Sequence, residues 1–128
     1  MKENEIISKS ELSELLHELD IAVDEGVSCD ENEHVYPRIV YWPYIEEDKV
    51  ASGEAYTNLA TYQISFFAKI PQHGKYKELR NKLRKKGIQP KFYHEYVEKD
   101  PIFSKTWHTY FSVEVLEEIE KEEVYGSC

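Results

Sequence analysis

The chain has 128 residues and a formal net charge of −9, from 25 acidic and 16 basic residues. This length suits one domain, which we expect over residues 1–128, with its core at about 8–116 and an acidic tail at 117–128. No apolar run is long enough to span a bilayer and no signal peptide is recognisable, so we expect no membrane partner and two reduced cysteines, Cys29 and Cys128. The net negative charge also argues against a protein that coats nucleic acid over its whole surface.

The charge is unevenly distributed along the chain. Residues 72–91 contain eight basic residues and one acidic residue, so this segment carries +7 and leaves −16 to the rest of the chain. We therefore expect a basic surface on an acidic body. The candidate interface residues are Lys75, Lys77, Arg80, Lys82, Arg84, Lys85, Lys86 and Lys91.

Residues 8–20 have the pattern of an amphipathic helix. Ser8 and Glu11 have the spacing of a capping box, in which each side chain accepts a backbone N–H of the other residue. Leucines at 12, 15, 16 and 19 then form one apolar stripe, which we expect to pack against a sheet. A short strand is predicted at about 21–23.

The middle of the chain is expected to be rich in strand. Residues 35–44 are β-branched and aromatic but contain Pro37 and Pro43, which predicts an edge strand or one broken at its ends. Polar residues 46–49 predict a turn, and 50–55 a loop or weak strand. The strongest strand is predicted at about 56–70, where apolar and polar residues alternate.

A second helix is predicted over 75–86, where residues 76, 79 and 83 face the core. Gly87 has the position of the glycine that ends a helix in a Schellman motif. Strands at 91–98 and 106–116 follow and are expected to pair as an antiparallel hairpin. Runs of strands favour an α+β fold of order α-β-β-β-α-β-β, a mostly antiparallel or mixed sheet with both helices on one face.

No motif for catalysis, a cofactor or a metal is recognisable in the sequence. His94 and His108 lie on adjacent predicted strands, but alternation along each strand is expected to place Glu95 and Glu114 on the face opposite their neighbouring histidine, which weakens a joint site. Cys29 lies in an acidic segment, which disfavours a reactive thiolate. We therefore expect no enzyme, no cofactor and no metal site, and we expect polar surface histidines.

The basic segment at 75–91 is the one feature of the sequence that indicates a function. Three interpretations are open: the segment binds phosphates, it binds an acidic patch on another protein, or it is a solvated helix face without a partner. Readout of bases is not expected, because side chains that read or stack on bases are scarce among its charges. An acidic body with a basic stripe favours head-to-tail self-association, in which the stripe of one copy meets the acidic surface of the next.

The stretch from 48 to 115 resembles the small tail-terminator or tail-completion proteins of long-tailed bacteriophages and prophages. The likeness rests on the strand ATYQISFFAK (60–69), the basic helix ending in KKGI (85–88), and the strands FYHEYVE (92–98) and WHTYFSVEV (107–115). The opening helix and the segment 37–43 extend it over about 12–116. The acidic tail at 117–128 is not part of this likeness.

The resemblance implies an α+β structural protein without catalytic residues. It implies a hexameric ring on the head-proximal end of the tail tube, which stops tube growth and provides the surface that joins the head. The partners would be further copies of the chain, the major tail tube protein and a head-closure or connector protein. The protein would act in the host cytoplasm during assembly and then in the virion.

Two other functions remain open. One is another neck component, such as a head-closure protein. The other is a small nucleic-acid-binding accessory protein that uses the basic segment at 75–91, although direct contact with nucleic acid is not the expectation. An enzyme ranks below both, because no acid, base and nucleophile converge in the predicted fold.

Overall fold

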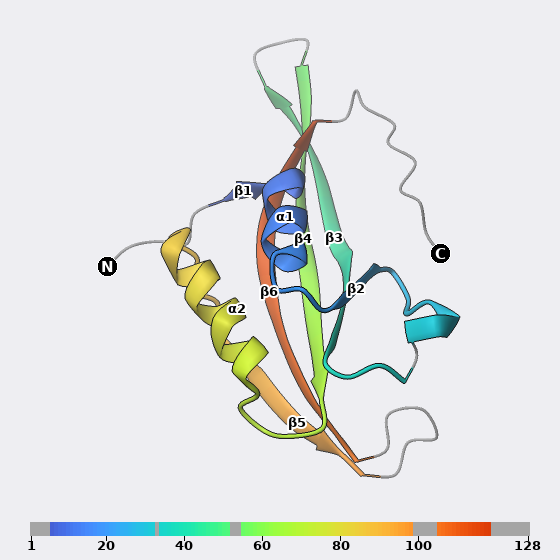
Figure 1. Ribbon diagram of the computed structural model, residues 1–128. Helices are drawn as coiled ribbons and strands as arrows, with labels where there is room; N and C mark the ends of the chain where they lie inside the picture. The colour runs from blue at the N-terminus through green and yellow to red at the C-terminus, as the bar shows by residue number, and fades with distance from the viewer. Residues whose placement is uncertain (1–5, 33, 52–54, 99–104, 119–128) are drawn as a thin grey trace.

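The computed structural model describes residues 6–32, 34–51, 55–98 and 105–118, which form an α+β fold of two α-helices and a six-stranded mixed sheet (Figure 1). The predicted order α-β-β-β-α-β-β is confirmed, and a two-residue strand precedes it. The elements are β1 (Ile7–Ser8), α1 (Lys9–His17), β2 (Ala22–Glu25), a 3₁₀ turn (Asp30–Asn32), β3 (Arg38–Ala51), β4 (Ala55–Ala68), α2 (Gly74–Lys85), β5 (Tyr93–Val97) and β6 (Thr106–Glu118).

The sheet has the strand order β1-β6-β4-β3-β2, and β5 pairs with β6. Strands β3, β4, β5 and β6 pair in antiparallel fashion, as predicted for the hairpin of β5 and β6. The short strands β1 and β2 pair parallel with β6 and β3. Because β4 occupies one side of β6, both β1 and β5 lie along its other side.

Helix α1 begins with the predicted capping box. The Glu11 backbone amide donates to Ser8 Oγ at 3.1 Å, and the Ser8 amide donates to the Glu11 carboxylate at 3.5 Å. Leu12, Leu15 and Leu16 are buried, so the predicted stripe faces the sheet. The helix ends slightly earlier than predicted, with Glu18 as its C-cap.

Helix α2 ends in the predicted Schellman motif. Gly87 has a φ of 79°, in the left-handed region where glycine is favoured. Its amide donates to the Arg84 carbonyl at 3.0 Å, and the Ile88 amide donates to the Leu83 carbonyl at 2.9 Å. The motif turns the chain sharply away from the helix and into the segment that leads to β5.

Strand β3 corrects one prediction and bears out parts of two others. It is one strand of 14 residues that includes the polar residues 46–49, which were expected to form a turn. Its pairing with β2 covers only Arg38 to Tyr41, so from Trp42 onward it is an edge strand among the described residues, one of the two forms predicted for 35–44. Pro43 does not break it, because the register with β4 shifts between Pro43 and Ile45 and leaves Tyr44 as an extra residue in a bulge. Residues 50–55, predicted as a loop or a weak strand, are strand at Val50, Ala51 and Ala55; residues 52–54 lie outside the described part.

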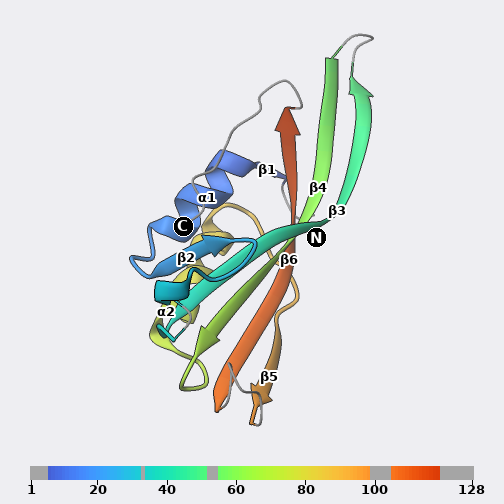
Figure 2. The ribbon, with the colours of Figure 1, turned by 90° about the vertical axis from the view of Figure 1, so that its right-hand side faces the viewer.

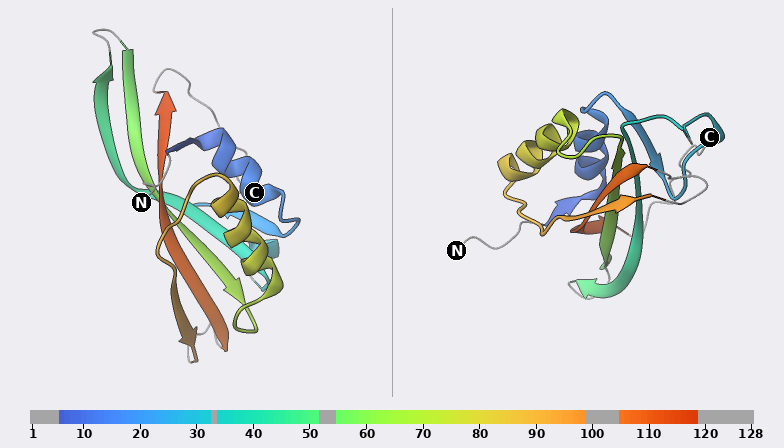
Figure 3. Two further views of the ribbon diagram at one scale, coloured as in Figure 1. Left: turned by 90° about the vertical axis from the view of Figure 1, so that its left-hand side faces the viewer. Right: turned by 90° about the horizontal axis from the view of Figure 1, so that it is seen from below.

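Both helices pack on one face of the sheet (Figures 2 and 3). The core lies between them and consists of the leucines of α1, Tyr76, Leu79 and Leu83 of α2, and alternate residues of β3, β4 and β6. In the described residues no helix covers the opposite face, which we call the bare face.

Two further expectations concern the chain ends and the cysteines. Strand β6 continues to Glu118, two residues past its predicted end, and the remainder of the acidic tail, 119–128, lies outside the described residues. Cys29 is disulfide-bonded, which corrects the expectation of a reduced thiol. Cys128 lies outside the described residues.

Candidate interaction surfaces

The structure divides the eight predicted interface residues into two groups. Six of them lie on α2, Lys86 is its C-cap, and Lys91 lies in the segment before β5. One group contacts α1 or its own helix, and the other points to solvent. The eight residues therefore do not form a single uniform surface.

Three lysines of this set, Lys75, Lys82 and Lys86, hold the two helices together. They lie on the flank of α2 that faces α1, and each contacts a carboxylate or a backbone carbonyl. The contacts are Lys82 Nζ to Glu18 Oε2 at 3.0 Å, Lys86 Nζ to Glu11 Oε2 at 3.8 Å, Lys75 Nζ to the Leu19 carbonyl at 2.7 Å, and Lys75 Nζ to Glu78 Oε2 at 3.4 Å. These positive charges therefore serve the fold.

The second group consists of the exposed residues Lys77, Arg80, Arg84, Lys85 and Lys91. Among the described residues, no carboxylate lies within 4.0 Å of any of these five side chains. This group is the part of the predicted interface that remains open to a partner.

Two arginines of the exposed group line a cavity of about 200 Å³ between α2 and the segment 88–92. Arg80 lies over the ring of Phe92, with Cζ 5.3 Å from the ring centroid, and its Nη1 donates to Tyr76 Oη at 3.5 Å. Arg84 Nη1 donates to Asn81 Oδ1 at 3.3 Å. No acidic residue is among the described residues that line this cavity. A pair of guanidinium groups held in this way is suited to a carboxylate or phosphate.

The bare face carries a row of stacked planar side chains that crosses four strands. The Arg38 guanidinium lies 4.7 Å from the ring centroid of Phe67, which stacks on His108 at 4.7 Å and 9°. His108 lies 4.9 Å from Tyr110, and Tyr110 stacks on Tyr93 at 5.3 Å and 16°. This row was not predicted, although the sequence carries a signal for it: Phe67, His108 and Tyr110 occupy alternate positions opposite the core residues of β4 and β6.

The cation at the start of this row affects Tyr36. Burial raises the pKa of the Tyr36 hydroxyl, but hydrogen bonds with Arg38 and Thr106 lower it. The positive charges of Arg38 and Lys69 lower it further, and the net result is a lowered pKa. On the core face the opposite holds for Tyr41, because burial and the Glu25 carboxylate raise its pKa against a hydrogen bond with Ser13.

His108 connects two polar residues of the bare face. Its Nδ1 lies 2.9 Å from Glu95 Oε1, and its Nε2 lies 2.9 Å from Ser65 Oγ. Glu95 lies on the face opposite its neighbour His94, as predicted, and the register of β5 and β6 places it directly across from His108. Glu114 lies on the same face of β6 as His108, so the expectation is wrong for that residue. His94 lies on the other face, where its Nδ1 is 2.8 Å from Thr109 Oγ1, so the two histidines form no joint site.

The Ser65, His108 and Glu95 contacts have the connectivity of a catalytic triad but not its accessibility. Ser65 is fully buried in the middle of β4, with β3 and β6 on either side. A substrate carbonyl could not reach its hydroxyl, and the amides of a central strand are committed to the sheet instead of forming an oxyanion hole. The contacts instead fix the ring of His108 within the stacked row.

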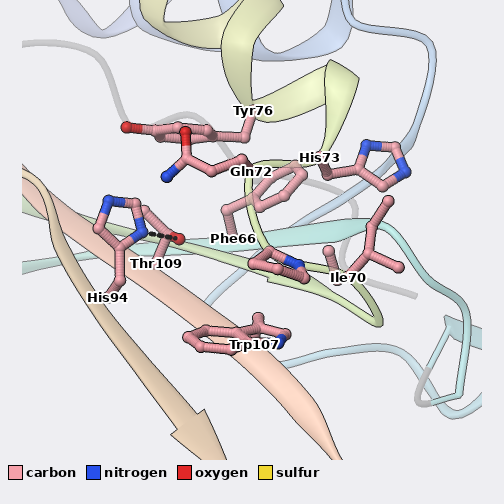
Figure 4. A pocket seen from close by; sticks show the side chains of 10 residues that line it. Phe66, Ile70, Gln72, His73, Tyr76, His94, Trp107 and Thr109 are labelled. Carbon is pink, nitrogen blue, oxygen red and sulfur yellow. Dashed lines mark hydrogen bonds between the residues drawn. The ribbon is translucent and has the colours of Figure 1, made fainter.

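A smaller hollow of about 40 Å³ lies beside the start of α2 (Figure 4). Figure 4 shows Tyr76 and Trp107 on opposite sides of it, with His94 and His73 toward its ends. His73 Nδ1 accepts the backbone amide of Lys75 at 3.0 Å, so it caps the helix. Small-molecule sites usually enclose about 300–1,000 Å³. The hollow is therefore too small for a substrate.

Within the described ranges, no group of three or more His, Cys, Asp or Glu side chains could hold a metal ion. In the same ranges, neither helix has the length and hydrophobicity needed to cross a bilayer. No known protein family matches the sequence, and no curated protein matches it.

Proposed function

We propose that this chain is a structural assembly protein of the tail-terminator kind. Copies of it would form a homo-oligomeric ring, expected to be a hexamer, that caps the head-proximal end of a phage tail tube and provides the surface for joining the head. The observation that carries the proposal is the composition of the bare face. The proposed partners are the major tail tube protein and a head-closure or connector protein.

The bare face exposes large apolar and aromatic side chains where a solvated sheet face would normally carry polar ones. They are Tyr44 at 51 %, Ile45 at 48 %, Tyr93 at 50 % and Leu116 at 44 % exposure. Together with the stacked row they provide the aromatic and aliphatic surface that is typical of protein interfaces. We infer that a second copy of the chain covers part of this face.

The edges of the sheet supply two different surfaces for ring closure. On one side β5 pairs only with β6, and on the other side β2 pairs with β3 only from Arg38 to Tyr41. In the described residues, the β3 edge from Trp42 onward therefore has no partner strand. Association of two different surfaces, one on each copy, produces rings when the rotation closes.

The tail-terminator role itself is supported by the resemblance in strand and helix patterns and by the element order. A subunit of this kind needs interfaces and no active site. It would be made in the host cytoplasm and then become part of the virion. The charge of the exposed α2 residues adds a possible docking surface for the acidic surface of a neighbour.

The self-association is tested by light scattering coupled to size-exclusion chromatography, or by native mass spectrometry. We expect a ring-sized mass, or a monomer that assembles when tail tubes are added. Ile45→Glu and Tyr93→Glu should lower the mass to that of a monomer. Ile70→Glu is the matched control, because Ile70 is 56 % exposed and lies outside the bare face. A monomer under all conditions, with tubes present, contradicts the proposal.

The role at the tail is tested with polymerising tail tube protein. Adding the chain should shorten the tubes and place density at one end of each tube in negative-stain micrographs. A nucleic-acid-binding protein would instead retard DNA at low salt and release it steeply as salt rises. If the tubes keep their length and the chain retards DNA, the structural role is wrong and the protein is a nucleic-acid-binding protein.

A further inference from the structure

We propose that the cavity beside α2 is a socket for a carboxylate of a neighbouring copy. The socket is formed by Arg80 and Arg84, and the carboxylate is that of Glu46 or Glu47 on β3. This inference rests on the self-association proposed above and names the contact that joins one copy to the next.

The socket has the geometry of a carboxylate site. Arg80 and Arg84 are one helical turn apart, so their side chains lie on the same face of α2. Phe92 and Tyr76 restrict the position of the first guanidinium, and Asn81 that of the second. Guanidinium groups that are held in place recognise a carboxylate through paired N–H donors and lose less conformational entropy than mobile lysines.

The described part of the same copy does not fill this socket. The carboxylates that reach α2 are those of Glu11, Glu18 and Glu78, and all three contact lysines on the flank that faces α1. The cavity itself is lined by no described acidic residue. The socket is therefore open to a carboxylate from outside the described part of the chain.

The acidic residues of β3 are placed to reach a second copy. Glu46 and Glu47 follow the bulge of β3 and are exposed, and the next residue, Asp48, is exposed and accepts a hydrogen bond from Asn58 at 2.9 Å. This part of β3 and β4 extends beyond the two helices (Figure 2). The side chains of Glu46 and Glu47 are therefore available to a neighbour because both are exposed.

The charge distribution favours this partner over nucleic acid. Outside residues 72–91 the chain carries −16, which repels a long polyphosphate over most of the surface. An acidic strand of a second copy brings only a few negative charges to the one basic region. We therefore argue for the protein partner and treat nucleic acid as an outcome of the test.

The test is a charge reversal followed by mixing. Arg80→Glu with Arg84→Glu, and separately Glu46→Arg with Glu47→Arg, should each weaken association by at least about tenfold. Mixing the two variants one to one should restore the oligomer. Each socket then meets residues 46 and 47 of the other variant, which carry the opposite charge. Native mass spectrometry gives the composition of the mixed oligomer, and circular dichroism establishes that both variants fold.

The matched control is Lys77→Glu with Lys85→Glu. It makes the same change in net charge on the same helix, at two exposed residues outside the cavity. This control should weaken association much less than the arginine variant, because the two lysines add to the positive charge of α2 but do not line the cavity. If the control variant loses association as strongly as the arginine variant, association depends on the overall positive charge of α2 and not on the socket, and the inference is overturned.

A cross-link provides a second readout. Arg84→Lys places an amine in the socket, which a zero-length carbodiimide can couple to a carboxylate. In a mixture of ¹⁵N-labelled and unlabelled copies, we expect cross-linked peptides of mixed isotope content that join position 84 to Glu46 or Glu47. Cross-links only to residues 117–128 of the same copy would assign the socket to the acidic tail and overturn the inference.

The remaining outcomes separate this inference from the proposed function. If the oligomer persists in both charge-reversal variants and no such cross-link forms, the socket inference is overturned but the proposed ring is not. A monomeric wild-type chain that gives no inter-copy cross-link overturns both. If the arginine variant keeps the oligomer and loses only DNA retardation, the cavity is a nucleic-acid site and the inference is overturned.

Discussion

Glu95 faces His108 across the pair of strands β5 and β6, with its Oε1 2.9 Å from His108 Nδ1. The other ring nitrogen lies 2.9 Å from Ser65 Oγ, and the ring centroid lies 4.7 Å from that of Phe67 and 4.9 Å from that of Tyr110. His108 is therefore held at both ring nitrogens and contacts two aromatic rings. This residue fixes the centre of the bare face, which the proposed function uses as an interface.

His108→Ala should lower the free energy of unfolding by about 2 kcal/mol, since it removes two ring contacts and leaves the buried hydroxyl of Ser65 without this partner. Urea denaturation gives the value. Glu95→Gln should cost less than about 1 kcal/mol, because Glu95 is 54 % exposed and water screens its contact with His108. Equal losses for the two variants would show that stacking contributes nothing.

Gly87→Ala should lower the free energy of unfolding by about 1 kcal/mol, because φ is 79° at this position and a β-carbon is disfavoured there. Gly74→Ala is the matched control. An added Cβ at Gly74 meets no atom within 4 Å, so that variant should keep or slightly raise stability. Thermal unfolding of both variants measures the difference, and a neutral Gly87→Ala would contradict the prediction.

Lys75→Met should destabilise the contact between the helices by about 1 kcal/mol, because Lys75 Nζ donates to the free carbonyl of Leu19 at the end of α1. Lys77→Met removes the same charge from the exposed side of α2 and should change stability by less than about 0.5 kcal/mol. Chemical denaturation at one salt concentration compares them. Similar values for the two variants would mean that the Lys75 contact has no energetic weight.

Tyr41→Phe should reduce the loss of stability at high pH. The raised pKa of Tyr41 means that its hydroxyl stays neutral in the folded chain while an unfolded tyrosine ionises near about pH 10. This contribution to stability is complete below about pH 10 and is lost as pH rises further, so the variant should lose less than wild type above that pH.

Tyr36→Phe is the control of opposite sign for this pH dependence. The lowered pKa of Tyr36 contributes stability that grows as pH rises through the folded pKa and is complete above about 10. Its removal should therefore steepen the alkaline loss. Urea denaturation at a series of pH values from 8 to about 11 tests both variants; parallel profiles for the two would contradict the assignment.

The features that the sequence predicted well are those determined by neighbouring residues. The capping box of Ser8 and Glu11 and the helix end at Gly87 depend on contacts over three to five residues, and both are present. Alternation along β4 and β6 likewise predicted which side chains face the core. The α+β class followed from the order of these elements.

The features that were missed depend on pairing between distant segments. Pro37 and Pro43 predicted an edge strand or one broken at its ends, but the long partner β4 keeps β3 continuous to Ala51 and the bulge accommodates Pro43. The contact of Glu95 with His108 depends on the register between two strands, which alternation along one strand does not specify. Similarly, three lysines of the predicted interface pair with α1 or its own helix, because the fold brings the two helices together.

The central place of β6 has a consequence for biosynthesis. Its hydrogen bonds reach β4 on one side and β1 and β5 on the other. Strand β1, which begins at Ile7, therefore cannot pair until β6 leaves the ribosome about a hundred residues later. A chain interrupted before residue 106 cannot join the two sides of its sheet. The full sheet therefore forms only when synthesis is almost complete, since it needs pairing between segments that lie far apart in the chain.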